Sequence, residues 1–233
     1  MTGPEIVRVD SRTVLGAQLE HAGIDLNRPV LVVVGGAAGM DSEVARALTG
    51  LCSNLLVPML DRLGTAVVDG GTDVGVMQLM GQARASARAS FPLIGVAADR
   101  TVTLPGQRRG SPGSAPAEPR HSHLVIVPGG TWGDESSWLA ATATVIAGDR
   151  PSATLLINGG TIAYTDVLYS LEAGRPTVVL AGSGRAADDI ARARTEPSTG
   201  TPAAAIAESP LTQVISLSEP ALVLASITGI LTA

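Results

Sequence analysis

The sequence contains no lysine, and all 16 of its basic residues are arginine. This absence excludes Schiff-base chemistry and a phosphate-binding lysine of the Walker type. A phosphate group would have to be bound by arginine side chains and by backbone N–H groups, which suit bidentate or cradle-like recognition of oxyanions. Binding of a phosphate group is therefore limited to arginine side chains and backbone N–H donors.

Cysteine and aromatic residues are also scarce. The single cysteine, Cys52, lies in an apolar stretch, so no intramolecular disulfide forms and the chain suits a reducing compartment. We interpret its thiol as a buried structural group rather than a nucleophile. Because aromatic residues make up 2% of the chain, the core must consist of valine, leucine, isoleucine and alanine. That composition is typical of parallel strands covered on both faces.

Long hydrophobic runs and an excess of positive charge are missing as well. No run approaches the roughly 18 apolar residues of a membrane-spanning helix, and the first residues lack the apolar core of a signal peptide. The formal net charge of -5 gives no basic field for nucleic acid. We expect a soluble cytoplasmic protein without membrane insertion or a nucleic-acid partner, which requires no cofactor and forms a homo-oligomer.

The chain is long enough for one sizeable core. Its 233 residues, 45% of them hydrophobic, predict a single α/β domain with a doubly wound, mainly parallel sheet and helices on both faces. We expect residues 1–28 to form an N-terminal strand and helix, and residues 29–194 to form the ligand-binding unit. Residues 195–233 should add a C-terminal strand and helix packed on the same domain.

Five aliphatic runs each end at closely spaced glycines, which is the pattern of strand, tight loop and helix. In a parallel sheet all such loops lie at the carboxyl edge, where open α/β folds bind ligands. Glycine also lets backbone N–H groups approach phosphate oxygens, although tight turns need glycine in any case. The residues that we predict to line one binding site are Gly35, Gly36, Gly39, Gly70, Gly71, Thr72, Gly129, Gly130, Thr131, Trp132, Gly133, Gly159, Gly160, Thr161, Gly182, Ser183, Gly184 and Arg185.

Three side chains near these loops have more than one interpretation. Arg185 either clamps a pyrophosphate or ribose phosphate at a helix start, with Ser183 as the N-cap, or is an exposed helix-start arginine. Trp132 either stacks on adenine or fills a subunit interface. Glu135 is the best candidate for acid–base work or a ribose hydroxyl contact, and its alternative role is to compensate a helix dipole. We expect Asp166 to be solvated or to cap a helix.

Two further segments have functional and structural interpretations. His121 and His123 should share one face of a strand, but a zinc site would need more ligands, so we predict no metal. Residues 99–120 are rich in proline, glycine, serine and arginine and predict an unstructured loop. Such a loop is either an arginine-bearing lid over an anionic ligand or a solvated insertion.

Four segments of the chain carry a family resemblance: Val-Gly-Gly at 34–36, His-Ser-His-Leu-Val-Ile-Val at 121–127, Ile-Asn-Gly-Gly-Thr at 157–161 and Ala-Gly-Ser-Gly-Arg-Ala-Ala-Asp at 181–188. Together they resemble the SLOG superfamily, and most closely the cytosolic N-terminal domain of TRPM ion channels and its free-standing prokaryotic relatives. The resemblance implies a Rossmann-like fold, a bacterial protein and a nucleotide-derived ligand such as ADP-ribose, held as a signal by a ligand sensor.

The same superfamily includes the LOG phosphoribohydrolases, which split the base from a nucleoside 5'-monophosphate. Their pattern, P-G-G-x-G-T-x-x-E, is similar to this chain at Pro128, Gly129 and Gly130. Trp132 stands at the next glycine of the pattern, and Ser136 or Ser137 at its glutamate. The resemblance thus leaves hydrolysis as the alternative to binding, with Glu135 as the catalytic residue in that case.

Overall fold

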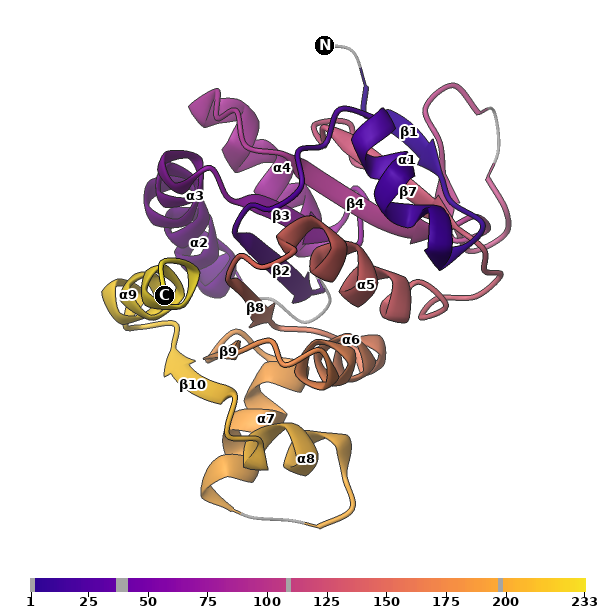
Figure 1. Ribbon diagram of the computed structural model, residues 1–233. Coiled ribbons are helices and arrows are strands. Elements are labelled where there is room, and N and C mark those ends of the chain that lie inside the picture. Colours follow the sequence, from indigo (N-terminus) through magenta and orange to yellow (C-terminus); the bar gives the residue numbers. More distant parts are fainter. Residues whose placement is uncertain (1–2, 37–41, 108–109, 197–198) are drawn as a thin grey trace.

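The fold is built around one parallel sheet of eight strands in a computed structural model that describes residues 3–36, 42–107, 110–196 and 199–233 (Figure 1). The strands are β1 (Glu5–Arg8), β2 (Val30–Gly35), β3 (Ala66–Asp69), β4 (Leu93–Ala98), β7 (His123–Val127), β8 (Ser152–Ile157), β9 (Thr177–Ala181) and β10 (Thr212–Ser216). Every neighbouring pair is parallel. The α/β fold class predicted from the sequence is confirmed.

The order of the strands reverses once in the middle of the sheet. Across the sheet the order is β1-β7-β4-β3-β2-β8-β9-β10. From β2 the chain builds outward through β3, β4 and β7, and then returns to the other side of β2 to add β8, β9 and β10. The junction of β2 and β8 is therefore a topological switch point, where crevices open at the carboxyl edge of such sheets.

Helices cover both faces because the strands are aliphatic on both faces. Val32 and Val34 belong to one core cluster, whereas Leu31 and Val33 belong to the other. The first face carries α1 (Leu15–His21), α5 (Ser136–Ala147), α6 (Thr161–Glu172), α7 (Arg185–Thr195) and α8 (Pro202–Glu208), and the second carries α2 (Ser42–Leu51), α3 (Val57–Leu63), α4 (Gly75–Ala87) and α9 (Pro220–Leu231). Among the described residues, no helix has both the length and the apolar composition needed to cross a bilayer.

Three local features were not part of the sequence prediction. A π-helical segment, η2 (Cys52–Leu56), lies between α2 and α3, and a short 3-10 turn, η1 (Arg12–Val14), precedes α1. Helix α8 has no predicted counterpart. It begins after Thr201, whose side chain accepts a hydrogen bond from the N–H of Ala204, and Pro202 occupies its first turn.

Residues 99–120 were predicted to be unstructured, and this is wrong for their described part, residues 99–107 and 110–120. β5 (Val102–Thr103) and β6 (Ala115–Pro116) pair in parallel, and Ala117 bridges to Thr72. Val102 and Ala117 pack with the β7 residues Leu124 and Ile126 in a third small core. The segment thus takes the place of a crossover helix between the adjacent parallel strands β4 and β7.

A close backbone crossing lies beneath this segment. Gly71 has a positive φ of 65° after β3 and lies directly against Gly95 in β4. A Cβ atom on Gly95 would overlap the backbone of Gly71 and would come within 2.8 Å of Leu124 Cδ1. The glycine at position 95 is therefore required by packing rather than by backbone conformation.

We expect Gly95→Ala to lower the free energy of unfolding by about 2 kcal/mol or more, because overpacking in a core typically costs about 1–3 kcal/mol. Gly229→Ala in α9 is the matched control, since a Cβ there meets nothing within 4 Å. That change should raise stability by roughly 0.5–1 kcal/mol through helix propensity. Urea titration measures both, and equal effects of the two changes would contradict the crossing.

Candidate functional site

The switch point holds a cavity of about 370 Å³ at the carboxyl ends of β2, β3 and β8. Its lining residues are Val33, Val34, Gly35, Gly36, Gly70, Thr72, Met77, Trp132, Glu135, Leu139, Gly160, Thr161, Ile162, Ala163, Asp166 and Arg185. We call it the switch-point cavity. It is in the size range of small-molecule sites. All five glycine-ended loops contribute at least one lining residue or a direct neighbour in the loop.

The predicted site residues do not all reach this cavity. Those that line it are Gly35, Gly36, Gly70, Thr72, Trp132, Gly160, Thr161 and Arg185, together with Glu135. Gly39 lies outside the described residues. Those that do not line it are Gly71, Gly129, Gly130, Thr131, Gly133, Gly159, Gly182, Ser183 and Gly184. The predicted residues along the edge of the sheet are thus only partly brought together in the switch-point cavity.

The loop between β7 and α5, which we expected to bind an anion, is occupied by its own carboxylates. Asp134 Oδ2 accepts hydrogen bonds from the N–H groups of Gly130 at 2.8 Å and Thr131 at 2.9 Å. Glu135 Oε2 accepts one from Gly133 at 3.0 Å. The bonds from Thr131 and Gly130 lower the pKa of Asp134, so it remains anionic at neutral pH. These N–H groups already have an anionic partner.

The loop between β9 and α7 shows the same arrangement. Asp188 Oδ1 accepts the N–H of Gly182 at 2.6 Å. Ser183 was predicted to cap α7, but the residue at the N-cap is Gly184, without a side-chain bond. Ser183 Oγ instead accepts from the N–H of Asn158 at 2.7 Å and donates to the carbonyl of Leu180 at 2.6 Å. Ser183 is buried and joins the ends of β8 and β9.

The loop between β8 and α6 differs because a cation stands beside it. The guanidinium of Arg185 lies over Gly160, where a Cβ would come 3.3 Å from Nη2. Within the described part of the chain, no carboxylate pairs with Arg185. Its backbone has a φ of 48°, which is unusual for a residue with a side chain. An anion at this position would meet both the guanidinium and the positive end of α6.

Two carboxyl groups share the other side of the switch-point cavity. Burial, opposed by a hydrogen bond from Ser136 and assisted by the nearby charge of Glu135, raises the pKa of Asp166 to about 7. Burial also raises the pKa of Glu135, which is 8% exposed. Asp166 is thus not the solvated or capping residue that we expected. Near neutral pH it is able to donate or accept a proton.

Trp132 connects the cavity to the segment that crosses between β4 and β7. The residue is 43% exposed, and its Nε1 donates to the carbonyl oxygen of Gly113 at 3.2 Å. The indole is therefore held between the cavity wall and residues 110–120. The N–H donor lies in the plane of the ring, so the bond to Gly113 uses neither aromatic face.

His121 and His123 were predicted to share a face, and this is wrong because His121 precedes β7. His123 Nε2 lies 3.0 Å from the carbonyl oxygen of Ala22, behind α1. On the opposite side, His121 Nε2 lies 2.8 Å from Asp69 Oδ1 and Nδ1 lies 3.0 Å from Glu118 Oε2. The described residues hold no group of three side chains that could ligate a metal ion.

The charges around His121 are buried and matched. Burial alone would lower the pKa of His121, but Asp69 and Glu118 raise it to about 9, so the imidazole is a cation at neutral pH. Burial opposes ionisation of Glu118, yet the bonds from His121 and Arg120 lower its pKa below the usual value. Arg120 Nη1 donates to Glu118 Oε1 at 2.7 Å. This cluster fastens residues 118–121 across β3.

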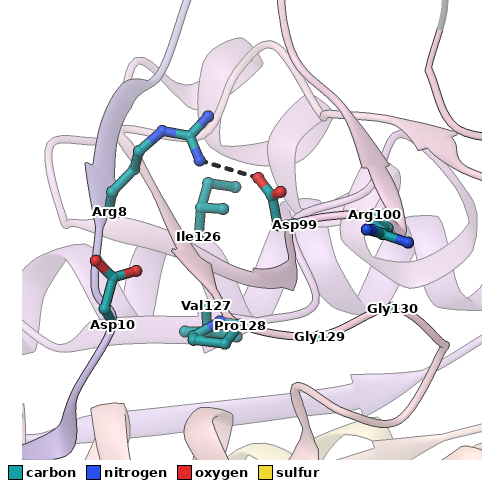
Figure 2. Close-up of a pocket in the computed structure, with 9 residues that line it drawn as sticks. All are labelled: Arg8, Asp10, Asp99, Arg100, Ile126, Val127, Pro128, Gly129 and Gly130. Carbon is teal, nitrogen blue, oxygen red and sulfur yellow. Dashed lines mark hydrogen bonds and ion pairs between the residues drawn. The ribbon is translucent and has the colours of Figure 1, made fainter.

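Gly129 and Gly130 line a different cavity, of about 460 Å³, near the β1 side of the sheet (Figure 2). We call it the edge cavity. Its lining residues are Arg8, Asp10, Asp99, Arg100, Ile126, Val127, Pro128, Gly129 and Gly130. It contains no predicted site residue other than the two glycines, and the sequence pattern offered no signal for it.

Comparison with known proteins identifies a family and a channel to which this chain is similar. The family model described as SLOG in TRPM, prokaryote, matches residues 28–225. The transient receptor potential cation channel subfamily M member 2 of Mus musculus is 24% identical over 213 residues, which is 76% of this chain and 14% of the channel. This chain thus spans a small part of that relative's length.

Two solved structures share the fold. The molybdenum cofactor carrier protein of Chlamydomonas reinhardtii has a TM-score of 0.57 at 16% identity, with 88% of this chain and 99% of the carrier covered. The structural-genomics target TM1055 has a TM-score of 0.50 at 18% identity, with 85% and 99% covered. At these identities the likeness shows the fold alone.

We expect the stability of the protein to fall as the pH rises from about 6.5 to about 9, because over that range the unfolded chain releases the proton of His121 while the folded state still holds it. The stabilisation from the raised pKa is fully present at pH values below the pKa of His121 in the unfolded chain. Its loss lowers the free energy of unfolding by about 2–4 kcal/mol. Urea titrations across this range, compared with His121→Gln, measure the effect. An NMR titration of the imidazole giving a pKa near 6.5 would contradict it.

Proposed function

Because this chain belongs to the family described as SLOG in TRPM, prokaryote, we propose that its switch-point cavity binds a nucleotide-derived ligand of the ADP-ribose type. In this proposal the protein is a ligand sensor and needs no further cofactor. The switch point of an open α/β sheet is where nucleotides commonly bind, which supports the position of the site. Fold alone does not fix function, so the proposal depends on the residues of the cavity.

The observation that carries the proposal is the guanidinium of Arg185, with which no carboxylate of the described residues pairs, beside Gly160 at the start of α6. The chain has no lysine, and Asp134 and Glu135 already occupy the donors of the β7–α5 loop. Arg185 is thus the cation that the switch-point cavity offers to an anion. We place the phosphates of the ligand between Arg185 and the N-terminus of α6.

The remaining polar and aromatic groups suit a nucleoside. The exposed face of Trp132 gives the adenine a stacking surface, and Glu135 and Asp166 lie where ribose hydroxyls can be bonded. Because the pKa of Asp166 is about 7, its neutral form can donate to an oxygen without repelling the phosphates. Val33, Val34 and Leu139 supply an apolar wall.

A second candidate function is cleavage of the base from a nucleoside 5'-monophosphate, and the position of Asp166 favours it. In P-G-G-x-G-T-x-x-E the glutamate follows the proline by eight positions, and Asp166 follows Asn158 by the same number (166 − 158 = 8). The loop that begins at Asn158 adjoins β2 at the switch point, whereas the loop at Pro128 does not. In this reaction the bond between the base and the ribose carbon breaks as Asp166 protonates the departing base, and water forms the new bond to that carbon. The proton that the water loses returns to Asp166.

We expect ADP-ribose at 100 times its dissociation constant to raise the melting temperature by roughly 5–10 °C, which corresponds to about 2.7 kcal/mol. Cyclic ADP-ribose, AMP and inorganic phosphate complete the series. Chromatography of each mixture should show no free base. Release of adenine from AMP would replace the sensor by the hydrolase, and Asp166→Asn should then abolish that release.

We expect Arg185→Gln to weaken ADP-ribose binding by about 10-fold or more, since a charged hydrogen bond is worth about 1.5–3 kcal/mol. Arg192→Gln on the same helix is the matched control, because Arg192 pairs with Asp189 at 3.0 Å and does not line the cavity. Calorimetric titration measures both. Binding that is as tight with Arg185→Gln as with the unaltered protein would remove Arg185 from the site.

A further inference from the structure

The edge cavity is built in part by residues outside the family match. Arg8 and Asp10 belong to the N-terminal segment, whereas the match begins at residue 28. β1 pairs with β7 in parallel, with Arg8 in register with Ile126. This pairing brings the end of β1 beside the β7–α5 loop. The N-terminal segment thus adds a wall that the family's matched region does not supply.

The charges of the cavity are only partly neutralised. Arg8 Nη1 and Asp99 Oδ1 form an ion pair at 2.9 Å. No hydrogen bond or ion pair from any described residue engages the carboxylate of Asp10 or the guanidinium of Arg100. Figure 2 shows the side chains of Asp10 and Arg100 on opposite sides of the lining residues, with the Arg8–Asp99 ion pair and Ile126 between them. As far as the described residues go, the cavity therefore presents one free charge of each sign, on opposite sides of the ion pair.

Arg100, rather than the neighbouring backbone N–H groups, is the donor available to the anionic end of a ligand. The N–H of Gly130 is taken by Asp134. The backbone N–H of Arg100 donates to the carbonyl of Gly129 at 3.3 Å, and its side-chain Cδ lies near Gly130. These contacts hold the stem of Arg100 against the loop, so that its guanidinium is the free donor on this wall. Ile126, Val127 and Pro128 give the cavity an apolar surface.

We propose that the edge cavity is a second ligand site, separate from the switch-point cavity, and that it binds a small zwitterion whose cationic end pairs with Asp10 and whose anionic end pairs with Arg100. A volume of about 460 Å³ is sufficient for a small molecule. A ligand with a single charge leaves Asp10 or Arg100 unmatched, so that selectivity favours the zwitterion. Because Asp10 and Arg100 lie on opposite sides of the Arg8–Asp99 ion pair, a ligand with its charges at the two ends of a chain is favoured over an α-amino acid, whose charges share one carbon.

The test is a calorimetric titration with β-alanine, 4-aminobutyrate and 6-aminohexanoate, compared with butyrate and butylamine. We expect at least one ω-amino acid to bind about 10-fold or more tightly than either singly charged compound, because each end adds a charged hydrogen bond. Asp10→Asn and Arg100→Gln should each weaken that binding by about 10-fold or more. Binding should also weaken as salt is raised.

Asp149→Asn and Arg150→Gln are charge-matched controls, since both side chains are exposed near the end of α5 and outside the cavity. They should leave the affinity unchanged. The proposal is overturned if none of the ω-amino acids binds more tightly than butyrate or butylamine, or if either cavity substitution has no effect. The response to ADP-ribose should be the same in Asp10→Asn and Arg100→Gln as in the unaltered protein, so failure of one site is distinguishable from failure of the other.

Discussion

The parallel arrangement of the sheet, with one reversal of strand order, is the constraint on which the rest of the molecule depends. All strands end at the same edge, so five loops from distant parts of the chain meet there. The reversal between β2 and β8 leaves no crossover above their junction, and the switch-point cavity opens in that space. The loops are otherwise of one type, but their surroundings give them different chemistry.

That difference comes from a few charged side chains. Asp134, Glu135 and Asp188 saturate backbone donors in two loops, while Arg185 leaves the β8–α6 loop with positive charge. In a lysine-free chain, the distribution of arginines and acids decides where an anion is stabilised. The glycines let the backbone approach a ligand closely. The neighbouring charge then distinguishes a loop that can bind an anion from a loop whose backbone donors are already bonded to a carboxylate.

The sequence predicted the sheet because each aliphatic run and its glycine turn are local features. It did not predict that residues 99–107 and 110–120 pack as a substitute for a crossover helix, since that depends on Ala97, Leu124 and Ile126 in other strands. Asp166 was also missed. The sequence analysis aligned the pattern P-G-G-x-G-T-x-x-E with the loop that follows β7, because that loop begins with Pro128. The strand order shows that the loop beginning at Asn158 is the one that adjoins β2.

β1 has a consequence for solubility that is independent of any ligand. β7 carries the apolar run from Leu124 to Val127, and without β1 its unpaired backbone groups would form the margin of the sheet. Such margins recruit strands from other molecules into aggregates. β1 is only four residues long and includes Glu5 and Arg8, so the margin that the protein actually presents is short and charged. The N-terminal strand thereby shields β7 from intermolecular pairing.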